Sequence, residues 1–384
     1  MREIVIDITN LTDTSFITGI QRVVQEVTMQ FCSMIPDRLK LVAEKKGKAG
    51  EFYTVSIESF RDHYANREKE FVIAENQVNL EDIAENIILF DIDSVWANPY
   101  CRTDFYPALK EKGAKIATFV HDVIPVTDPQ YCGEGTVFKF LGYLGAILQY
   151  DDLILTSTQS TVNEIENLEK RLGIERKPSA ATWLGAEFGK NNEALGSINS
   201  EIKALAGEKY VLCVGTIEPR KNQTYILDAF EKELFETDIK CVFAGREGWN
   251  VSSLVERMKK LPEFNEKFFW FSGLDDANIN YLYEHAFLMA FPTINEGFGL
   301  PIVEALQRGV PVIAHDKPVL KEVGGDYCRY FSIEETDEFI SLVKYYSDHP
   351  DEYNKWKQDL KTYQPVSWKK TAENMLTALS KLSD

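Results

Sequence analysis

Short apolar runs, each followed by a loop and a helix-like segment, recur through both halves of the chain. Such runs are typical of buried strands, because parallel sheets covered on both faces carry nearly continuous apolar strands. Regular alternation of strand and helix favours parallel sheets with helices on both faces, so the predicted fold class is α/β. The main predicted strands are residues 4–8, 87–90, 115–120, 152–157, 210–214, 240–244, 268–271, 287–291 and 311–314.

The chain is long enough for two hydrophobic cores. It has 384 residues, of which 44% are hydrophobic, and single cores rarely grow beyond roughly 250–300 residues. Residues 186–208 have few apolar positions and contain Gly, Asn and Ser, as is typical of a linker. The sequence therefore predicts one domain over residues 1–187 and another over 209–365, followed by a terminal amphipathic helix within 366–384.

Charge and cysteine content exclude several classes of function. The net charge of -18 argues against a protein that binds nucleic acid through a basic surface. The six cysteines form no C-x-x-C pair, so neither a disulfide framework nor a zinc site is expected. The first residues resemble a strand rather than a signal peptide, and no apolar stretch is long enough to span a membrane. We therefore expect a cytoplasmic protein.

One stretch in the second half, FPTINEGFGLPIVEALQRGVPV over residues 291–312, predicts a ligand site. Glycines punctuate the loop between its strand and its helix, and they let a ligand approach bare backbone N–H groups. A helix N-terminus with free N–H groups binds phosphate, whereas Glu296 and Glu304 would repel it and suit hydroxyl groups instead. A molecule with both phosphates and hydroxyls is a nucleotide-sugar. The loop residues proposed to contact it are Gly297, Phe298, Gly299 and Leu300.

A second strand, glycine turn and helix unit lies at residues 210–230. Its turn contains Gly215 and Thr216, and two adjacent cations, Arg220 and Lys221, precede the helix. Cations beside free N–H groups suit a diphosphate, because charge-assisted hydrogen bonds contribute about 1.5–3 kcal/mol each. We expect this loop to bind the diphosphate of the donor.

The Glu-x7-Glu spacing with Gly-Phe-Gly-Leu-Pro inside it resembles the signature of retaining glycosyltransferases of family 4. The resemblance implies the GT-B fold, in which two Rossmann-like domains face each other across a cleft and the terminal helix packs back on the first domain. It also implies that Glu296 faces the donor sugar and that Glu304 binds the ribose hydroxyls. It covers most of the chain but is looser before residue 115.

The same resemblance assigns roles to further residues. The turn at residues 215–222 resembles the family's diphosphate loop, although many members carry Arg directly after the glycine, where this chain has Thr216. His121 resembles the histidine that hydrogen-bonds the donor sugar. The nucleobase is expected at Ser272, Gly273 and Leu274, and the loop that contacts acceptor or phosphate is expected at Thr18, Gly19 and Arg22.

An Asp-x-Asp motif at Asp91 and Asp93 requires separate interpretation. In the other glycosyltransferase fold this motif binds a metal and the donor, but nothing else in the sequence indicates a metal site. A role in facing the acceptor sugar is the better hypothesis for Asp91, Asp93 or Trp96, because their loop follows a predicted strand. No cofactor and no metal are expected.

The sequence thus predicts a retaining, metal-independent glycosyltransferase that resembles bacterial surface-polysaccharide mannosyl- and rhamnosyltransferases. The donor would be a nucleotide-diphosphate sugar and the acceptor a glycan; a lipid-linked acceptor would bring the enzyme to the inner membrane face. Two alternatives stay open. One is a nucleotide-sugar epimerase or phosphorylase on the same fold, and the other is a non-catalytic subunit that supports a partner transferase, for which Thr216 is the main support.

Overall fold

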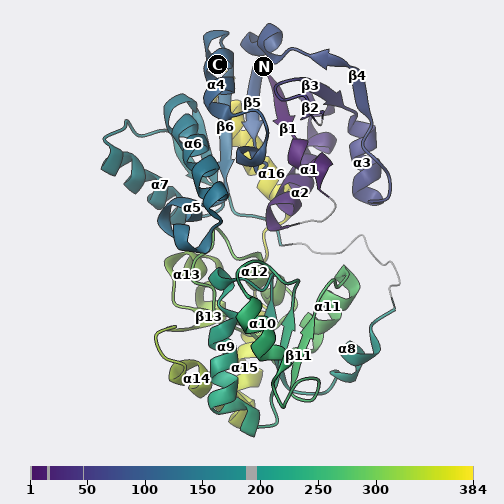
Figure 1. Ribbon diagram of the computed structural model, residues 1–384, viewed down its shortest axis with the longest axis vertical. Coiled ribbons are helices and arrows are strands. Elements are labelled where there is room, and N and C mark those ends of the chain that lie inside the picture. Colours follow the sequence, from purple (N-terminus) through teal and green to yellow (C-terminus); the bar gives the residue numbers. More distant parts are fainter. Residues whose placement is uncertain (1, 15–17, 46, 187–196, 384) are drawn as a thin grey trace. The chain divides into compact units, whose positions relative to one another are not determined.

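The computed structural model describes residues 2–14, 18–45, 47–186 and 197–383. It divides into two compact units (Figure 1). Unit 1 comprises residues 1–185 together with 366–384, and unit 2 comprises residues 186–365. The predicted linker at 186–208 lies partly outside the described residues, because 187–196 are not among them.

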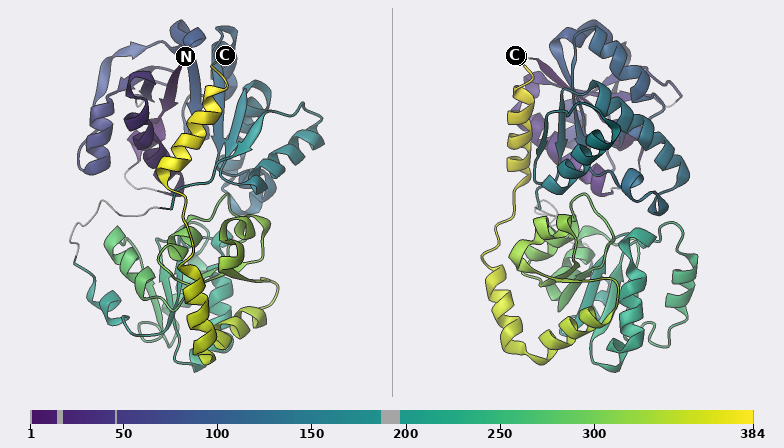
Figure 2. Two further views of the ribbon diagram at one scale, coloured as in Figure 1. Left: turned by 180° about the vertical axis from the view of Figure 1, so that it is seen from behind. Right: turned by 90° about the vertical axis from the view of Figure 1, so that its left-hand side faces the viewer.

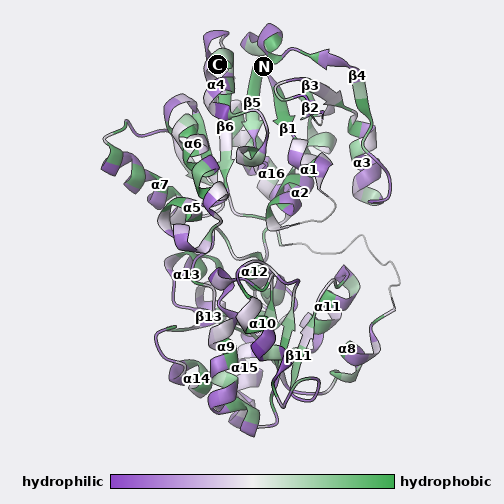
Figure 3. Cartoon of the chain, viewed as in Figure 1, coloured by the Kyte–Doolittle hydropathy of each residue, from purple (hydrophilic) through white to green (hydrophobic). Residues whose placement is uncertain are grey.

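Unit 1 is built on an eight-stranded sheet with the order β4-β3-β2-β1-β5-β6-β7-β8. Six strands are parallel, and β3 and β4 extend one edge in antiparallel pairing. The strands are β1 Glu3–Asp7, β2 Leu39–Glu44, β3 Phe52–Val55, β4 Ile73–Val78, β5 Ile87–Asp91, β6 Lys115–Val120, β7 Leu153–Thr156 and β8 Ser179–Ala181. Figure 3 shows β1 and β5 coloured hydrophobic, as buried parallel strands require.

Helices cover this sheet, and one of them comes from the far end of the chain. They are α1 Thr9–Asp13, α2 Gly19–Met34, α3 Ile57–Ala65, α4 Arg102–Glu111, α5 Ile124–Thr127, α6 Glu134–Tyr150, α7 Gln159–Leu172 and α16 Trp368–Ser380. Helix α16 contacts α2, and the Thr371 hydroxyl donates to the Trp183 carbonyl at 2.7 Å (Figure 2). The segment after β1, predicted as a loop, instead begins with the short helix α1.

A buried polar network joins β1, β5 and α4 inside unit 1. The guanidinium of Arg102 lies 2.6 Å from Asp7 and 2.6 Å from Asp91, and all three side chains are 0% exposed. Burial alone would lower the pKa of Arg102, but Asp91 and Asp7 raise it well above its usual range. Tyr106 donates to Asp91 at 2.7 Å, and Asn98 donates to Asp7 at 2.8 Å. The prediction that Asp91 faces an acceptor sugar is therefore wrong, because the carboxylate is fully occupied inside the unit.

Unit 2 is built on a six-stranded, wholly parallel sheet with the order β11-β10-β9-β12-β13-β14. This is the doubly wound order of dinucleotide-binding domains. The strands are β9 Tyr210–Val214, β10 Lys240–Ala244, β11 Phe268–Phe271, β12 Leu288–Phe291, β13 Val312–His315 and β14 Cys328–Phe331. Strand β14 was not predicted; its two buried residues, Cys328 and Phe331, are separated by Arg329 and Tyr330, so no continuous apolar run marks it.

The helices of unit 2 are α8 Ser200–Ala204, α9 Gln223–Lys232, α10 Ser252–Lys259, α11 Asp276–His285, α12 Leu300–Leu306, α13 Pro318–Gly324, α14 Asp337–Asp348 and α15 Pro350–Leu360. Helices α14 and α15 are separate because the first ends at Asp348, directly before His349 and Pro350. A proline lacks the N–H that would continue a helix but is well tolerated in a first turn.

The loops after β9 and β10 pack so closely that Gly245 has no room for a side chain. A Cβ atom at Gly245 would lie 1.9 Å from the carbonyl oxygen of Gly215. We expect Gly245→Ala to destabilise the protein by about 1–3 kcal/mol, because backbone must move to relieve the clash. Gly142→Ala is the matched control: nothing lies within 4 Å of that position on α6, and alanine favours a helix. Urea unfolding of both variants tests this, and equal stabilities would contradict it.

Candidate active site

The two loops singled out by the sequence meet at one place in unit 2. The order of the sheet reverses between β9 and β12, which are neighbours. In open α/β sheets, ligands bind at the carboxyl ends of the strands on either side of such a reversal. The loop after β9 contains Arg220 and Lys221, and the loop after β12 contains Glu296. The topology therefore brings the predicted cations and the predicted carboxylate to one edge of the sheet.

Backbone hydrogen bonds tie these two loops together. The N–H of Ile294 donates to the carbonyl of Arg220 at 2.8 Å, and the guanidinium of Arg220 donates to the carbonyl of Asn295 at 2.8 Å. Gly299, with φ of 94°, adopts the left-handed conformation directly before α12. That conformation is disfavoured for residues with a Cβ atom, which accounts for glycine at this turn.

Glu296 and the two cations form an ion cluster. The carboxylate of Glu296 contacts the Lys221 ammonium and lies 3.0 Å from the Arg220 guanidinium. Burial by itself would raise the pKa of Glu296, but Arg220 and Lys221 outweigh it and lower the pKa to about 2. Because this pKa is depressed, the cluster stabilises the fold above the carboxyl group's ordinary pKa and loses that contribution as the pH falls towards 2. Glu296 is therefore charged throughout the neutral range.

The sequence did not indicate three further groups around this cluster. Thr293 is buried, and its hydroxyl donates to Glu296 at 2.8 Å. His315 donates to the carbonyl of Thr293 at 2.9 Å, so it supports the strand end that carries the threonine. Glu218 accepts from Arg220 at 2.7 Å and is a second carboxylate partner of that guanidinium.

Glu304 lies inside helix α12. It is the fifth residue of that helix, just beyond the first turn, and it is 6% exposed. The hydroxyl of Tyr283, a buried residue of α11, donates to the Glu304 carboxylate at 3.0 Å. The Arg308 guanidinium lies over the Tyr283 ring at 5.2 Å. A ribose bound at Glu304 would share the carboxylate with the Tyr283 hydroxyl. No sequence motif marks Tyr283 as part of the site.

The other donor-loop candidates have differing surroundings. Phe298 is 5% exposed and packs inside unit 2, so any ligand contact there would involve its backbone. The carbonyl of Thr216 accepts from the Gln223 side chain at 2.9 Å, which anchors this turn to the start of α9. Ser272 and Gly273 are exposed directly after β11, and Leu274 is half-buried.

In unit 1, the predicted acceptor loop residues lie at the start of α2. Thr18 directly precedes the helix, and its hydroxyl contacts the Gln21 side chain. Gly19 is exposed and Arg22 is half-buried. The Gln21 amide in turn approaches Ser94 at 3.3 Å, which links this helix to the loop after β5.

His121 follows β6, and its Nε2–H donates to the carbonyl of Ile92 at 2.7 Å. Burial lowers its pKa to about 4, although that hydrogen bond opposes the shift. The ring is therefore neutral at neutral pH, with Nδ1 as an acceptor. This places a hydroxyl-accepting nitrogen at a strand end, which is compatible with the predicted contact to a sugar.

The low pKa of His121 predicts a loss of stability in acid. Between pH 6.5 and 4 the unfolded chain binds a proton at this residue and the folded protein does not, so stability falls as the pH drops through that window. From pH 7 to pH 5 the loss is about 2 kcal/mol. His121→Gln keeps an amide donor for the Ile92 carbonyl but cannot titrate. Between pH 7 and pH 5 its unfolding free energy should therefore fall by about 2 kcal/mol less than that of the parent protein.

Urea unfolding of both proteins at the two pH values measures the difference. Equal losses of unfolding free energy in the two proteins would contradict a lowered pKa for His121.

The acceptor-facing role is also wrong for Asp93. This residue is 0% exposed, and its carboxylate accepts from the N–H of Leu11 at 3.1 Å and from that of Ser94 at 2.6 Å. Trp96 packs edge-on against Phe140 at 5.3 Å but is only half-buried, so its contact with an acceptor sugar stays a prediction. Within the described residues, no group of three or more His, Cys, Asp or Glu is placed to hold a metal ion.

Among the helices in the described parts of the chain, none combines sufficient length with sufficient apolar character to cross a bilayer.

Comparisons with known proteins identify the domain that contains both loops of this site. Residues 198–362 match the family described as glycosyl transferases group 1. The chain is 28% identical to the serotype-specific mannosyltransferase WbdA of Escherichia coli over 401 residues, which cover 98% of this chain and 46% of WbdA. It is 30% identical to the O-antigen chain mannosyltransferase B of Escherichia coli over 233 residues, or 59% of each protein. The chain thus spans about half the length of the WbdA relatives.

A solved structure shows the same fold. Anabaena Alr3699/HepE in complex with UDP-glucose superposes with a TM-score of 0.71 at 13% identity, covering 99% of this chain and 100% of HepE. Together with the doubly wound sheet of unit 2, this similarity shows that the chain has the GT-B fold. Its residues 198–362 match the group 1 glycosyl transferases, and bacterial O-antigen mannosyltransferases are among the proteins to which it is similar.

Proposed function

We propose that the protein transfers a hexose from a nucleotide-diphosphate sugar to a glycan acceptor in polysaccharide synthesis. The ion cluster of Glu296, Arg220 and Lys221 carries this proposal, because it combines cations for a diphosphate with a carboxylate for sugar hydroxyls. A mannose-type sugar is favoured, since the relatives WbdA and O-antigen chain mannosyltransferase B are named as mannosyltransferases, with a rhamnose-type sugar second.

The proposed chemistry uses fixed charges of the chain itself. The diphosphate leaves towards Arg220 and Lys221, which stabilise the negative charge that develops on it, so no metal is needed. Glu296 orients the donor sugar, and we assign the same role in unit 1 to the neutral ring of His121. The acceptor hydroxyl attacks the anomeric carbon from the face on which the bond to the diphosphate breaks, and its proton passes to the departing phosphate oxygen, which retains the anomeric configuration without a covalent intermediate. The acceptor is proposed to be lipid-linked and used at the cytoplasmic face of the inner membrane.

Thermal unfolding with UDP, GDP, dTDP and ADP is the first test. A nucleotide at about 100 times its dissociation constant adds about 2.7 kcal/mol of stability. We expect one base to shift unfolding clearly, and its mannose conjugate to support transfer that continues in EDTA and gives a product of retained configuration by NMR. No shift with any of the four would favour the non-catalytic subunit, and conversion of the donor without acceptor would favour an epimerase or a phosphorylase.

A further inference from the structure

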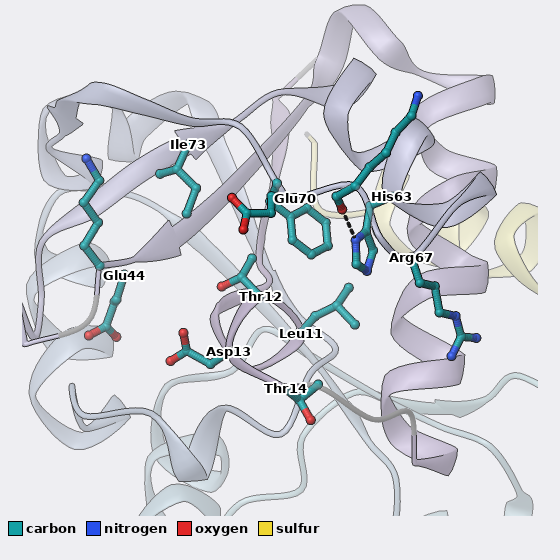
Figure 4. Close-up of a pocket in the computed structure, with 12 residues that line it drawn as sticks. Leu11, Thr12, Asp13, Thr14, Glu44, His63, Arg67, Glu70 and Ile73 are labelled. Atoms are coloured by element: carbon teal, nitrogen blue, oxygen red, sulfur yellow. Dashed lines mark hydrogen bonds between the residues drawn. The ribbon is translucent and has the colours of Figure 1, made fainter. Parts of the chain in front are cut away.

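Unit 1 contains a pocket of about 360 Å³ to which neither the proposed donor site nor any motif assigns a ligand (Figure 4). Its walls come from helix α1, from the end of β2, and from the segment that joins α3 to β4. The lining residues are Leu11, Thr12, Asp13, Thr14, Glu44, Lys45, His63, Arg67, Lys69, Glu70, Phe71 and Ile73.

The pocket lies at the carboxyl edge of the sheet of unit 1. Residues 11–14 follow strand β1, and Glu44 is the last residue of strand β2, so both walls belong to the carboxyl ends of neighbouring parallel strands, one strand away from the reversal of strand order between β1 and β5. Its volume falls within the roughly 300–1,000 Å³ of small-molecule sites. This size indicates a ligand site rather than a packing defect.

The walls of the pocket are held in place before any ligand binds. The Nδ1–H of His63 donates to the carbonyl of Lys69 at 2.6 Å, and the His63 ring lies 4.1 Å from the Phe71 ring. The Lys69 ammonium pairs with Asp62 at 2.8 Å. On the opposite wall, the Thr12 hydroxyl donates to the carbonyl of Thr9 at 2.8 Å, which leaves its oxygen able to accept.

The charges of the lining residues point to a neutral ligand. Three carboxylates, Asp13, Glu44 and Glu70, are matched by three cations, Lys45, Arg67 and Lys69. The three carboxylates would repel a phosphate group, whereas sugar hydroxyls can donate hydrogen bonds to carboxylates and accept them from cations.

Apolar residues complete the lining, as in most ligand pockets. Figure 4 shows Leu11 and Ile73 on different sides, with Thr12 and Glu70 pointing towards the space between them.

We propose that this pocket binds a neutral saccharide, the sugar end of the acceptor glycan, and so determines which acceptor is used. The identification as acceptor rests on the proposed transferase function. Glu70 is the anchor that can be tested most cleanly, because it is exposed and its replacement leaves the core of unit 1 intact.

The test compares Glu70→Gln with Glu68→Gln, an exposed carboxylate two residues away that does not line the pocket. Linear α-mannotriose is titrated by ligand-observed NMR into each variant and the parent chain, and inorganic phosphate is titrated separately. Glu70→Gln should weaken binding of the triose about tenfold or more, as loss of a charged hydrogen bond predicts. Glu68→Gln should bind like the parent, and phosphate should not displace the triose.

The nucleotide-induced thermal shift, measured on the same samples, separates this proposal from the transferase function. A parent chain that shows the nucleotide shift but binds no triose overturns the pocket and leaves the donor site standing. Triose binding that depends on Glu70 without any nucleotide shift supports the pocket and counts against the transferase. Equal weakening by the two substitutions, or competition by phosphate, also overturns the proposal.

Discussion

Replacing Glu296 by Gln is expected to lower the rate of sugar transfer by roughly 10²–10³-fold while leaving nucleoside diphosphate binding as tight or tighter. The carboxylate contacts both cations of the site, so a diphosphate must take its place beside Arg220 and Lys221. The Glu296→Gln substitution removes that competition but also removes the charged acceptor for sugar hydroxyls. A single electrostatic group of this kind contributes about 2.7–4 kcal/mol to a transition state. Steady-state kinetics measures the rate of sugar transfer, and calorimetric titration measures nucleotide binding, with whichever nucleotide the thermal unfolding test selects.

Two further substitutions make this result specific. Glu218→Gln removes the other carboxylate partner of Arg220, at 2.7 Å, and should leave the turnover rate nearly unchanged. Glu296→Gln should keep or strengthen nucleoside diphosphate binding, whereas Lys221→Ala should weaken it by about 10–100-fold, because one charge-assisted hydrogen bond is lost. If Glu296→Gln weakens the nucleotide as strongly as Lys221→Ala does, the carboxylate is not a competitor of the diphosphate. If it keeps full turnover, Glu296 does not orient the sugar.

Replacing Arg102 by Met should destabilise unit 1 by about 3–5 kcal/mol, because Asp7 and Asp91 would be left buried without their cation. Amide hydrogen exchange measures the loss of stability separately in unit 1 and in unit 2. Amides of β1 and β5 should exchange much faster in the variant, whereas those of β9 and β10 in unit 2 should serve as an unchanged reference.

The matched control for Arg102 is an exposed ion pair in the same unit. Lys69 and Asp62 lie 2.8 Å apart with both side chains 53% exposed, and such pairs contribute about 1 kcal/mol or less. Lys69→Met should therefore leave exchange in β1 and β5 almost unchanged. Adding Asp7→Asn and Asp91→Asn to Arg102→Met should restore part of the loss by removing the unpaired charges. Similar behaviour of Arg102→Met and Lys69→Met would show that the network contributes little.

Sequence patterns were sufficient for most of the central strands and for the placement of the two donor loops. Strands such as Lys240–Ala244 and Phe268–Phe271 are continuous apolar runs, and burial on both faces of a parallel sheet requires such runs. The glycines and prolines between them mark where chains turn, so the loops that contain Lys221 and Glu296 could be located. The ligand roles of these residues stay predictions until the substitutions are made.

The contacts among these side chains could not be predicted, because they join residues far apart in the chain. Lys221 and Glu296 are 75 positions apart, and the reversal of strand order between β9 and β12 brings them together. Asp7 meets Arg102 across 95 positions, so the sequence could not show that the carboxylates near β5 are internal counter-ions. Strand β14 has only four residues, with Arg329 and Tyr330 between its two buried ends, which is too weak a signal without the neighbouring strand β13.

Helix α16 has a consequence for the order in which the chain is made. It belongs to unit 1, where Ala372, Met375 and Leu379 are fully buried, yet the ribosome synthesises it after residues 186–365 of unit 2. At about 5–20 residues per second, roughly 9–36 seconds separate the end of the first segment of unit 1 from its last helix. Unit 2 can therefore fold while the α2 side of unit 1 is still uncovered, and unit 1 is completed only after the whole of unit 2 has been made.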